Sequence, residues 1–143
     1  MKFILSIVAV ATMFVMISCG GGGDEGAAGG ADWKNDKGVG PISSVQVGEI
    51  DQALVSQGST IFTQKCTACH KIEEKYIGPA LKGVANRRSP EWIMNMILNP
   101  DRMVKENAAA KKLFEEFMTP MSNQNLKQEE ARALLEYLRS VSP

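Results

Sequence analysis

The stretch Cys66-Thr67-Ala68-Cys69-His70 decides how this 143-residue chain folds. Two cysteines at this spacing, on one turn of helix, can form thioethers with the two vinyl groups of one porphyrin. The adjacent histidine can then bind the iron as its proximal ligand. The motif therefore predicts a haem that is covalently attached at Cys66 and Cys69 and ligated by His70.

Other interpretations of this motif fail on the rest of the sequence. A structural zinc site requires four ligands, and apart from Cys19 the chain offers two cysteines and one histidine. A thioredoxin-like redox pair requires a βαβ setting, whereas the flanking sequence is helical in pattern. Because His70 is the only histidine, two histidines of this chain cannot ligate the iron. The sixth ligand is then a methionine, a lysine, another weak donor, or absent.

The N-terminus has the pattern of an export signal. Lys2 is followed by a mostly apolar run over residues 3–17, shorter than the roughly 20 residues that a membrane-spanning helix requires. The charged start, the short apolar stretch and the small Ser18 predict a signal peptide over residues 1–18. Cys19 follows directly, as in a bacterial lipobox, although Met16 stands where leucine is usual. We expect lipid on Cys19; the alternative is an ordinary secretory signal with a chance cysteine.

Two segments separate Cys19 from the motif region. Residues 19–31 are nearly all glycine and alanine after the cysteine, a composition typical of a flexible tether. Residues 32–48, called the arm below, are too apolar for a pure linker, since they include Val39, Pro41, Ile42, Val45 and Val47. We expect an ordered arm that packs on a single domain over residues 49–143.

Apolar spacing and capping residues predict the helices. A first helix is expected over about residues 51–65, with Ile50, Leu54, Gly58 and Ile61 on one face. A second opens at Ser89-Pro90 and ends at Asn99-Pro100. Residues 107–117 and about 128–140 predict two more.

Further markers give the sequence a resemblance to the class I cytochromes c, small all-helical carriers of a single haem. The resemblance covers roughly residues 48–142. Its markers, in order, are Gly58, Phe62, the haem motif, Ile77-Gly78-Pro79-Ala80-Leu81, Trp92, Asn99-Pro100, a methionine near residue 120, and Tyr137-Leu138. The haem motif is highly specific, whereas the other markers count through their order and spacing. The resemblance implies an all-α fold of a few short helices wrapped around one covalent haem c.

The resemblance also implies roles for residues around the haem. The Pro79 carbonyl would accept a hydrogen bond from the second ring nitrogen of His70, and Leu81 would press on the porphyrin face. Trp92 is expected in the core, and by resemblance alone its indole N–H could donate to a haem propionate. Arg87 and Arg88 could pair with propionates or form a solvated surface, and both interpretations stay open.

The sixth ligand is expected in Met118-Thr119-Pro120-Met121, near the place where the family puts its ligand methionine. Met118 would end a helix beside Phe114 and Phe117, so it is most simply a core residue. Met121 follows Pro120 in an irregular stretch, as the family's ligand loop does. We therefore predict that Met121 is the sixth ligand.

Charge is balanced over the whole chain, with 16 basic and 16 acidic residues, and gives no argument for nucleic acid as a partner. It is uneven along the chain, because residues 65–88 hold six basic side chains and only Glu73 and Glu74 as acids. A basic collar around a haem edge would steer the protein onto an acidic partner. Ordinary solubility is the alternative explanation.

The function that the resemblance implies is single-electron transfer, with iron cycling between Fe(II) and Fe(III), and no enzymatic activity. Redox proteins would be donor and acceptor, with a terminal oxidase or a periplasmic reductase as possible acceptor, and no small-molecule substrate. The expected place is the bacterial cell envelope, lipid-anchored and facing the periplasm or the external side. Two alternatives are a haem peroxidase, which needs acid–base groups at an open distal site, and a haem-based sensor with an open sixth position.

Overall fold

The computed structural model describes residues 32–142. The predicted signal peptide, Cys19 and the tether lie outside the described residues. Among residues 32–142, no helix combines the length and apolar character needed to cross a membrane. This part of the chain is all-helical: α1 (Gln52–Lys65), α2 (Pro90–Leu98), α3 (Pro100–Glu106), α4 (Ala108–Phe117), α5 (Gln128–Ser140) and a short 3₁₀ helix at Val84–Asn86.

Side-chain caps fix where the helices begin. Asp51 accepts from the backbone N–H groups of the first turn of α1, at 2.8 and 3.2 Å. Ser89 Oγ accepts from Trp92 N at 3.1 Å, with Pro90 as the first residue of α2. Asn107 caps α4 in the same way. These caps satisfy N–H groups that have no partner within the helix.

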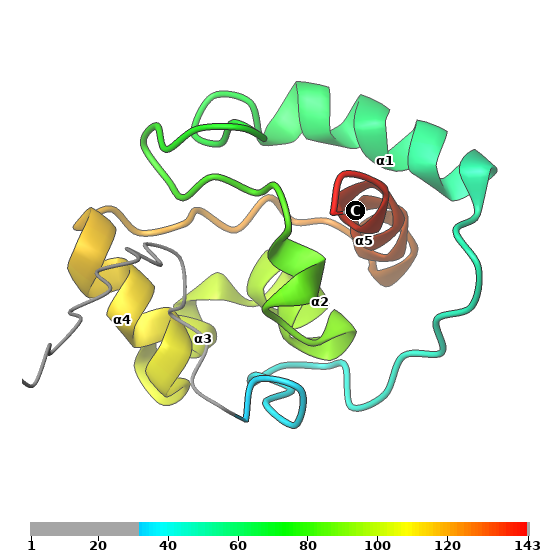
Figure 1. Ribbon diagram of the computed structural model, residues 1–143. Coiled ribbons are helices and arrows are strands. Elements are labelled where there is room, and N and C mark those ends of the chain that lie inside the picture. Colours follow the sequence, from blue (N-terminus) through cyan, green and yellow to red (C-terminus); the bar gives the residue numbers. More distant parts are fainter. Residues whose placement is uncertain (1–31, 143) are drawn as a thin grey trace, which may run out of the picture.

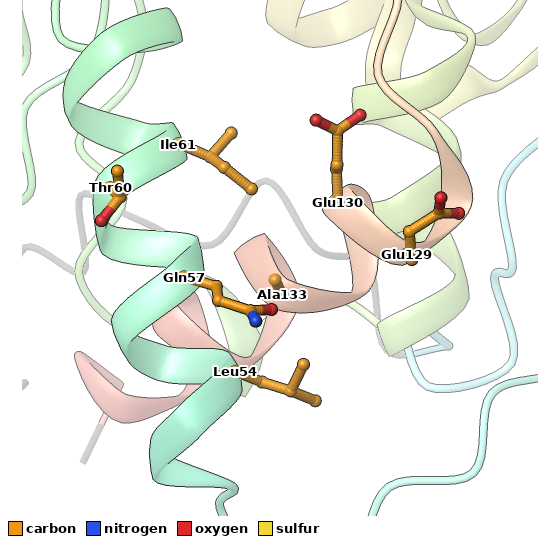
Figure 2. A pocket seen from close by; sticks show the side chains of 7 residues that line it. All are labelled: Leu54, Gln57, Thr60, Ile61, Glu129, Glu130 and Ala133. Carbon is orange, nitrogen blue, oxygen red and sulfur yellow. The ribbon is translucent and has the colours of Figure 1, made fainter.

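The most extensive contact between helices is the crossing of α1 and α5 (Figure 1). Gly58 makes it possible, because a Cβ atom there would overlap with the carbonyl oxygen of Ala133. The rings of Phe62 and Tyr137 pack beside it with centroids 5.2 Å apart. Where the two helices diverge they leave an open groove, lined by Leu54, Gln57, Thr60, Ile61, Glu129, Glu130 and Ala133 (Figure 2). None of these lining residues belongs to the predicted site.

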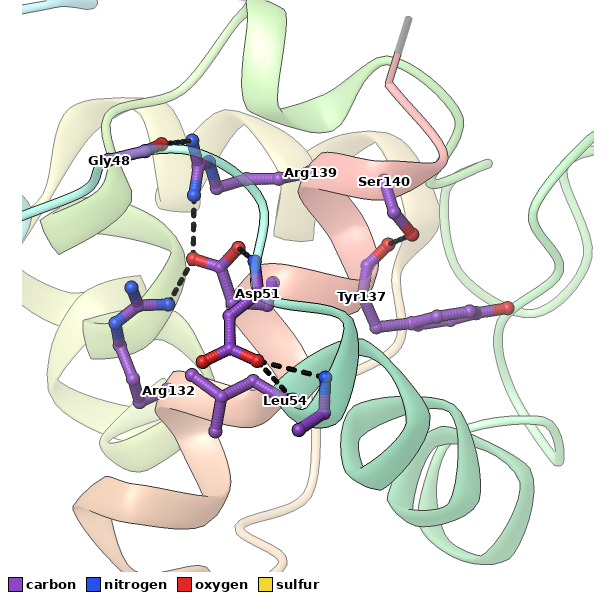
Figure 3. A network of polar contacts seen from close by, with 9 residues as sticks. Gly48, Asp51, Leu54, Arg132, Tyr137, Arg139 and Ser140 are labelled. Atoms are coloured by element: carbon purple, nitrogen blue, oxygen red, sulfur yellow. Dashed lines mark hydrogen bonds and ion pairs between the residues drawn. The ribbon is translucent and has the colours of Figure 1, made fainter.

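A buried carboxylate ties α5 to the chain that enters α1. Glu136 is wholly buried and accepts hydrogen bonds from Arg132 and Arg139 of its own helix and from Asp51 N. Figure 3 shows the two arginines beside Asp51, and Arg139 also donates to the Gly48 carbonyl at 2.6 Å. Burial raises the pKa of Glu136, but the hydrogen bonds from both arginines outweigh it, and the net shift is downward.

The arm lies along α2 and continues round to the start of α1 (Figure 1). Ile42 is buried, and its N–H and carbonyl bond to the side chain of Asn95 at 3.0 and 2.9 Å. The Asn95 amide also donates to the Lys37 carbonyl at 2.9 Å. Val39 and Val45 pack on the core, whereas Val47 is 40% exposed and Pro41 is also exposed.

One helix was not predicted from the sequence, and two expectations about the fold were wrong. Residues 100–106 form α3, because Pro100, which ends α2, is also a favourable first residue for the next helix. Ile50 lies before α1 and is 39% exposed, so it is not on the helix face. Met118 is 74% exposed instead of buried. It takes a left-handed conformation, φ 50°, at the end of α4, which turns it away from the apolar face.

Candidate haem site

The haem motif forms a tight turn directly after α1. Cys66 caps the helix, and its carbonyl accepts from the N–H groups of Cys69 and His70 at 3.0 and 2.8 Å. Both thiols are free, with Cys66 half-buried and Cys69 exposed. Burial, with a smaller contribution from Cys69, raises the pKa of the Cys66 thiol to about 11. The turn therefore presents two neighbouring thiols beside one imidazole.

The imidazole of His70 lies in a cradle made by Gly78 and Pro79. Its Nδ1 is 3.2 Å from the Pro79 carbonyl oxygen, the contact that the resemblance implies. Gly78 packs against the ring so closely that a Cβ atom would lie 2.6 Å from Cε1. Burial lowers the pKa of His70, and the bond to Pro79 opposes that shift. A neutral ring that donates through Nδ1 leaves Nε2 as a lone-pair donor for a metal.

These observations fit a covalently bound haem c. The ring nitrogen that could bind iron comes directly after the two thiols, and a carbonyl fixes the orientation of the ring. Leu81 and Met121 are both partly buried and pack against the core. Backbone bonds from Leu81 to Lys71 and from Lys82 to Ile72 close the intervening residues into a loop, at 3.1 and 2.8 Å.

Trp92 has a partner that the sequence did not predict. It is buried at the start of α2, and its indole N–H donates to Asn107 Oδ1 at 3.0 Å. The suggested bond from Trp92 to a haem propionate thus competes with a bond inside the protein. Asn107 could have been noticed as a capping residue before residues 108–117, but nothing in the sequence joins it to Trp92.

Arg87 and Arg88 differ although they are adjacent. Arg87 donates to the carbonyls of Ala80 and Lys82 at 2.8 and 2.6 Å, so it braces the loop that follows Pro79. Arg88 is only 4% exposed and lies over the Trp92 ring, 4.9 Å from its centroid. The interpretation of both arginines as a solvated surface is therefore wrong for Arg88.

The basic collar is weaker than the residue count suggests. Lys75 pairs with Glu116 at 2.9 Å, and Lys82 pairs with Glu73 at 2.8 Å. Lys71 donates to the Thr67 carbonyl, and its ammonium lies over the ring of Tyr76. Since Arg88 is buried as well, three of the six positive charges are either paired with a carboxylate or withdrawn from solvent.

Comparison with known proteins decides the family. The cytochrome c family model matches residues 55–142. The chain belongs to the cytochrome c family. A solved cytochrome c from Rhodothermus marinus is 45% identical, with a TM-score of 0.72, over 78% of this chain and 95% of that one. An engineered form of that cytochrome, bound to a carbene intermediate, is 44% identical with a TM-score of 0.68, over 78% and 96% of the two chains.

A curated relative, the cytochrome c-553-like protein of Synechocystis, is 41% identical over 44 residues. That match spans 30% of this chain and 42% of the relative's length. Together with the all-helical fold, these likenesses make the protein a class I c-type cytochrome with a covalently bound haem c. They also support a role for this cytochrome as an electron carrier.

Proposed function

We propose that this cytochrome carries single electrons between redox proteins on the periplasmic or external side of a bacterial membrane, to which Cys19 anchors it. The observation that carries the proposal is the His70 ring, held by the Pro79 carbonyl directly after two free thiols. A rigid site of this kind suits outer-sphere transfer, since the ligands need not rearrange when the charge on the metal changes.

The site residues have distinct tasks in this proposal. Cys66 and Cys69 would bind the haem, and His70 and Met121 would ligate its iron. When bound, the haem supplies the Fe(II)/Fe(III) couple, and a thioether ligand raises its potential relative to a second imidazole. The Pro79 carbonyl makes the His70 ring a more basic ligand, and Leu81 helps to exclude water.

Donor and acceptor would be proteins, with a terminal oxidase or a periplasmic reductase as acceptor. The charge around residues 65–88 supports only modest steering, because Lys75 and Lys82 are paired with carboxylates. We expect the rate of electron exchange with a partner to depend less on salt than six free positive charges would require.

Carbon monoxide binding to the reduced protein tests the carrier function. With Met121 on the iron, binding at neutral pH is slow, and the ferric protein shows the near-infrared band of methionine-ligated haem. Met121→Ala should abolish the band and speed binding, whereas Met118→Ala, at an exposed position, should do neither. Rapid binding to the unaltered protein would contradict a closed carrier site and favour a peroxidase or a sensor.

Membrane attachment is tested at Cys19. Cys19→Ser should release the protein from the membrane fraction, as should a chain that starts near residue 31 behind a cleavable signal. Detergent, and not salt, should extract the unaltered protein. If salt alone removes the unaltered protein from membranes, Cys19 carries no anchor.

A further inference from the structure

One residue of the arm bonds to the capping residues of two helices. The backbone carbonyl of Asp36 accepts from Ser89 Oγ, the cap of α2, at 2.6 Å. The Asp36 carboxylate accepts from the side-chain amide of Asn107, the cap of α4, at 2.8 and 3.1 Å. The carboxylate also accepts from Gly38 N at 2.9 Å, which fixes the turn of the arm. Asp36 therefore holds α2 and α4 in one arrangement.

The side-chain amide of Asn107 has partners at both ends. Its oxygen accepts from the Trp92 indole and from Ala110 N, both at 3.0 Å, while its nitrogen donates to Asp36. These contacts are part-buried, and hydrogen bonds to a carboxylate are about twice as strong as those between neutral groups. The start of α4 is thus fixed against both α2 and the arm.

Helix α4 leads directly to the predicted ligand. It ends at Phe117, Met118 reverses the chain in a left-handed conformation, and Met121 follows three residues later. The far end of α4 is held to the loop after His70 by the pair of Lys75 and Glu116, whose side chains are 68% and 46% exposed. Exposed pairs contribute little, so the stronger polar restraint on α4 is at its Asn107 end.

We propose that Asp36 is a positioning residue for the loop 118–121, acting through Asn107 and α4. This inference deepens the proposed function, because it takes Met121 of that loop as the sixth ligand. The arm, far from the ligand in sequence, would then set how firmly the thioether is held.

The test compares Asp36→Ala with Asp32→Ala in the full-length protein carrying haem. Asp32 is an exposed carboxylate of the same arm, and its side chain accepts from its near neighbour Asn35 at 2.6 Å. In Asp36→Ala we expect carbon monoxide to bind faster and the amides of Met118, Thr119 and Met121 to exchange faster, each about tenfold. We also expect a weaker near-infrared band and a lower reduction potential. Asp32→Ala should change none of these.

Asn107→Ser provides an independent second variant. A serine can still cap α4 but cannot reach both Asp36 and Trp92, so the helix start is kept while its link to the arm is cut. It should reproduce the effects of Asp36→Ala. In the double variant, the combined effect of Asp36→Ala and Asn107→Ser on amide exchange in the loop should be less than the sum of the two single effects, because both substitutions remove the bond between Asp36 and Asn107.

Failure of this inference can be told from failure of the ligand assignment. If Met121→Ala loses the band while Asp36→Ala and Asn107→Ser keep unaltered amide exchange and carbon monoxide rates, the positioning role is wrong and the ligand stands. If Met121→Ala keeps the near-infrared band, the assignment of Met121 as the sixth ligand is wrong. Amide exchange in the loop 118–121 then tests by itself whether Asp36 positions this loop. Unaltered exchange in Asp36→Ala overturns that role.

Discussion

Where α1 crosses α5 the contact is close and largely apolar, whereas the arm is joined to α2 and α4 by side-chain hydrogen bonds. At the crossing, Gly58 admits the backbone of α5, and the Phe62 and Tyr137 rings fill the space beside it. At the arm, Asp36 and Asn95 supply specific bonds to groups more than 50 positions away along the chain. The first contact depends on shape, and the second depends on individual donors and acceptors.

This difference predicts different responses to substitution. A close crossing between backbones has no room for an added atom, since protein interiors are packed as densely as crystals. In the hydrogen-bonded arm the loss of a partner is costly, because a buried amide left without one keeps its full desolvation cost. Substitutions in each region therefore test the comparison.

The largest effect is expected at the crossing. Gly58→Ala places a Cβ against the Ala133 carbonyl, which the backbone cannot avoid without moving α1 from α5. We expect a loss of about 3 kcal/mol in the free energy of unfolding, measured with guanidinium chloride. Gly48→Ala is the matched control, because a Cβ there meets no atom within 4 Å. Equal stability of the two variants would show that the crossing is not tight.

The next effect is expected in the arm. Asn95→Ala removes all of the side-chain bonds from α2 to Lys37 and Ile42. We expect a loss of about 2 kcal/mol and faster protease cleavage within residues 37–45. Asn35→Ala, which loses only an exposed local bond to Asp32, is the control. If Asn95→Ala destabilises without exposing the arm to protease, these bonds do not hold it.

The same contrast explains what the sequence predicted. The crossing has a signature in the chain, because Gly58, Phe62 and Tyr137 stand in helical patterns with recognisable roles. The His70 cradle was likewise implied by Gly78-Pro79. The apolar residues of the arm indicated that it packs, but no periodic pattern records that Asp36 meets Asn107 or that Asn95 meets Ile42. Such bonds follow from the tertiary fold alone.

Met118 shows a second limit of the sequence. Its spacing from Phe114 continued the apolar face of α4, so a core position was expected. A left-handed residue at the helix end is decided by the path of the following chain, and methionine carries no local signal for it. The choice between the two interpretations of Arg88 stayed open for a related reason, since its burial depends on packing against Trp92.

A smaller effect with a defined pH dependence is expected at Glu136. Its pKa is lowered in the folded protein, so its contribution to stability is present above the unfolded pKa of about 4.3 and is lost as pH falls through the folded pKa. Glu136→Gln should cost about 2 kcal/mol at pH 7 and clearly less at pH 3, measured by thermal unfolding. The control Glu129→Gln, exposed on the same helix, should show no such pH dependence.

The smallest effect is expected at the exposed end of α4. Lys75→Gln and Glu116→Gln each break a solvent-exposed ion pair and should cost less than about 0.5 kcal/mol. In high salt, unfolding measurements should show no coupling between Lys75 and Glu116, because salt screens exposed charges. A loss of 2 kcal/mol or more would mean that α4 is held from both ends, and it would weaken the contrast with Asp36.

The bonds between Asn95 and the arm also bear on where a shortened version of this protein can begin. A chain that began at residue 49 would keep all of the helices described above. The buried side-chain amide of Asn95 would, however, lose its hydrogen-bond partners in the arm. The folding unit therefore extends upstream of residue 55, where the family model begins, at least to Asp36. Recombinant work that trims the chain to its helices would study a weakened protein.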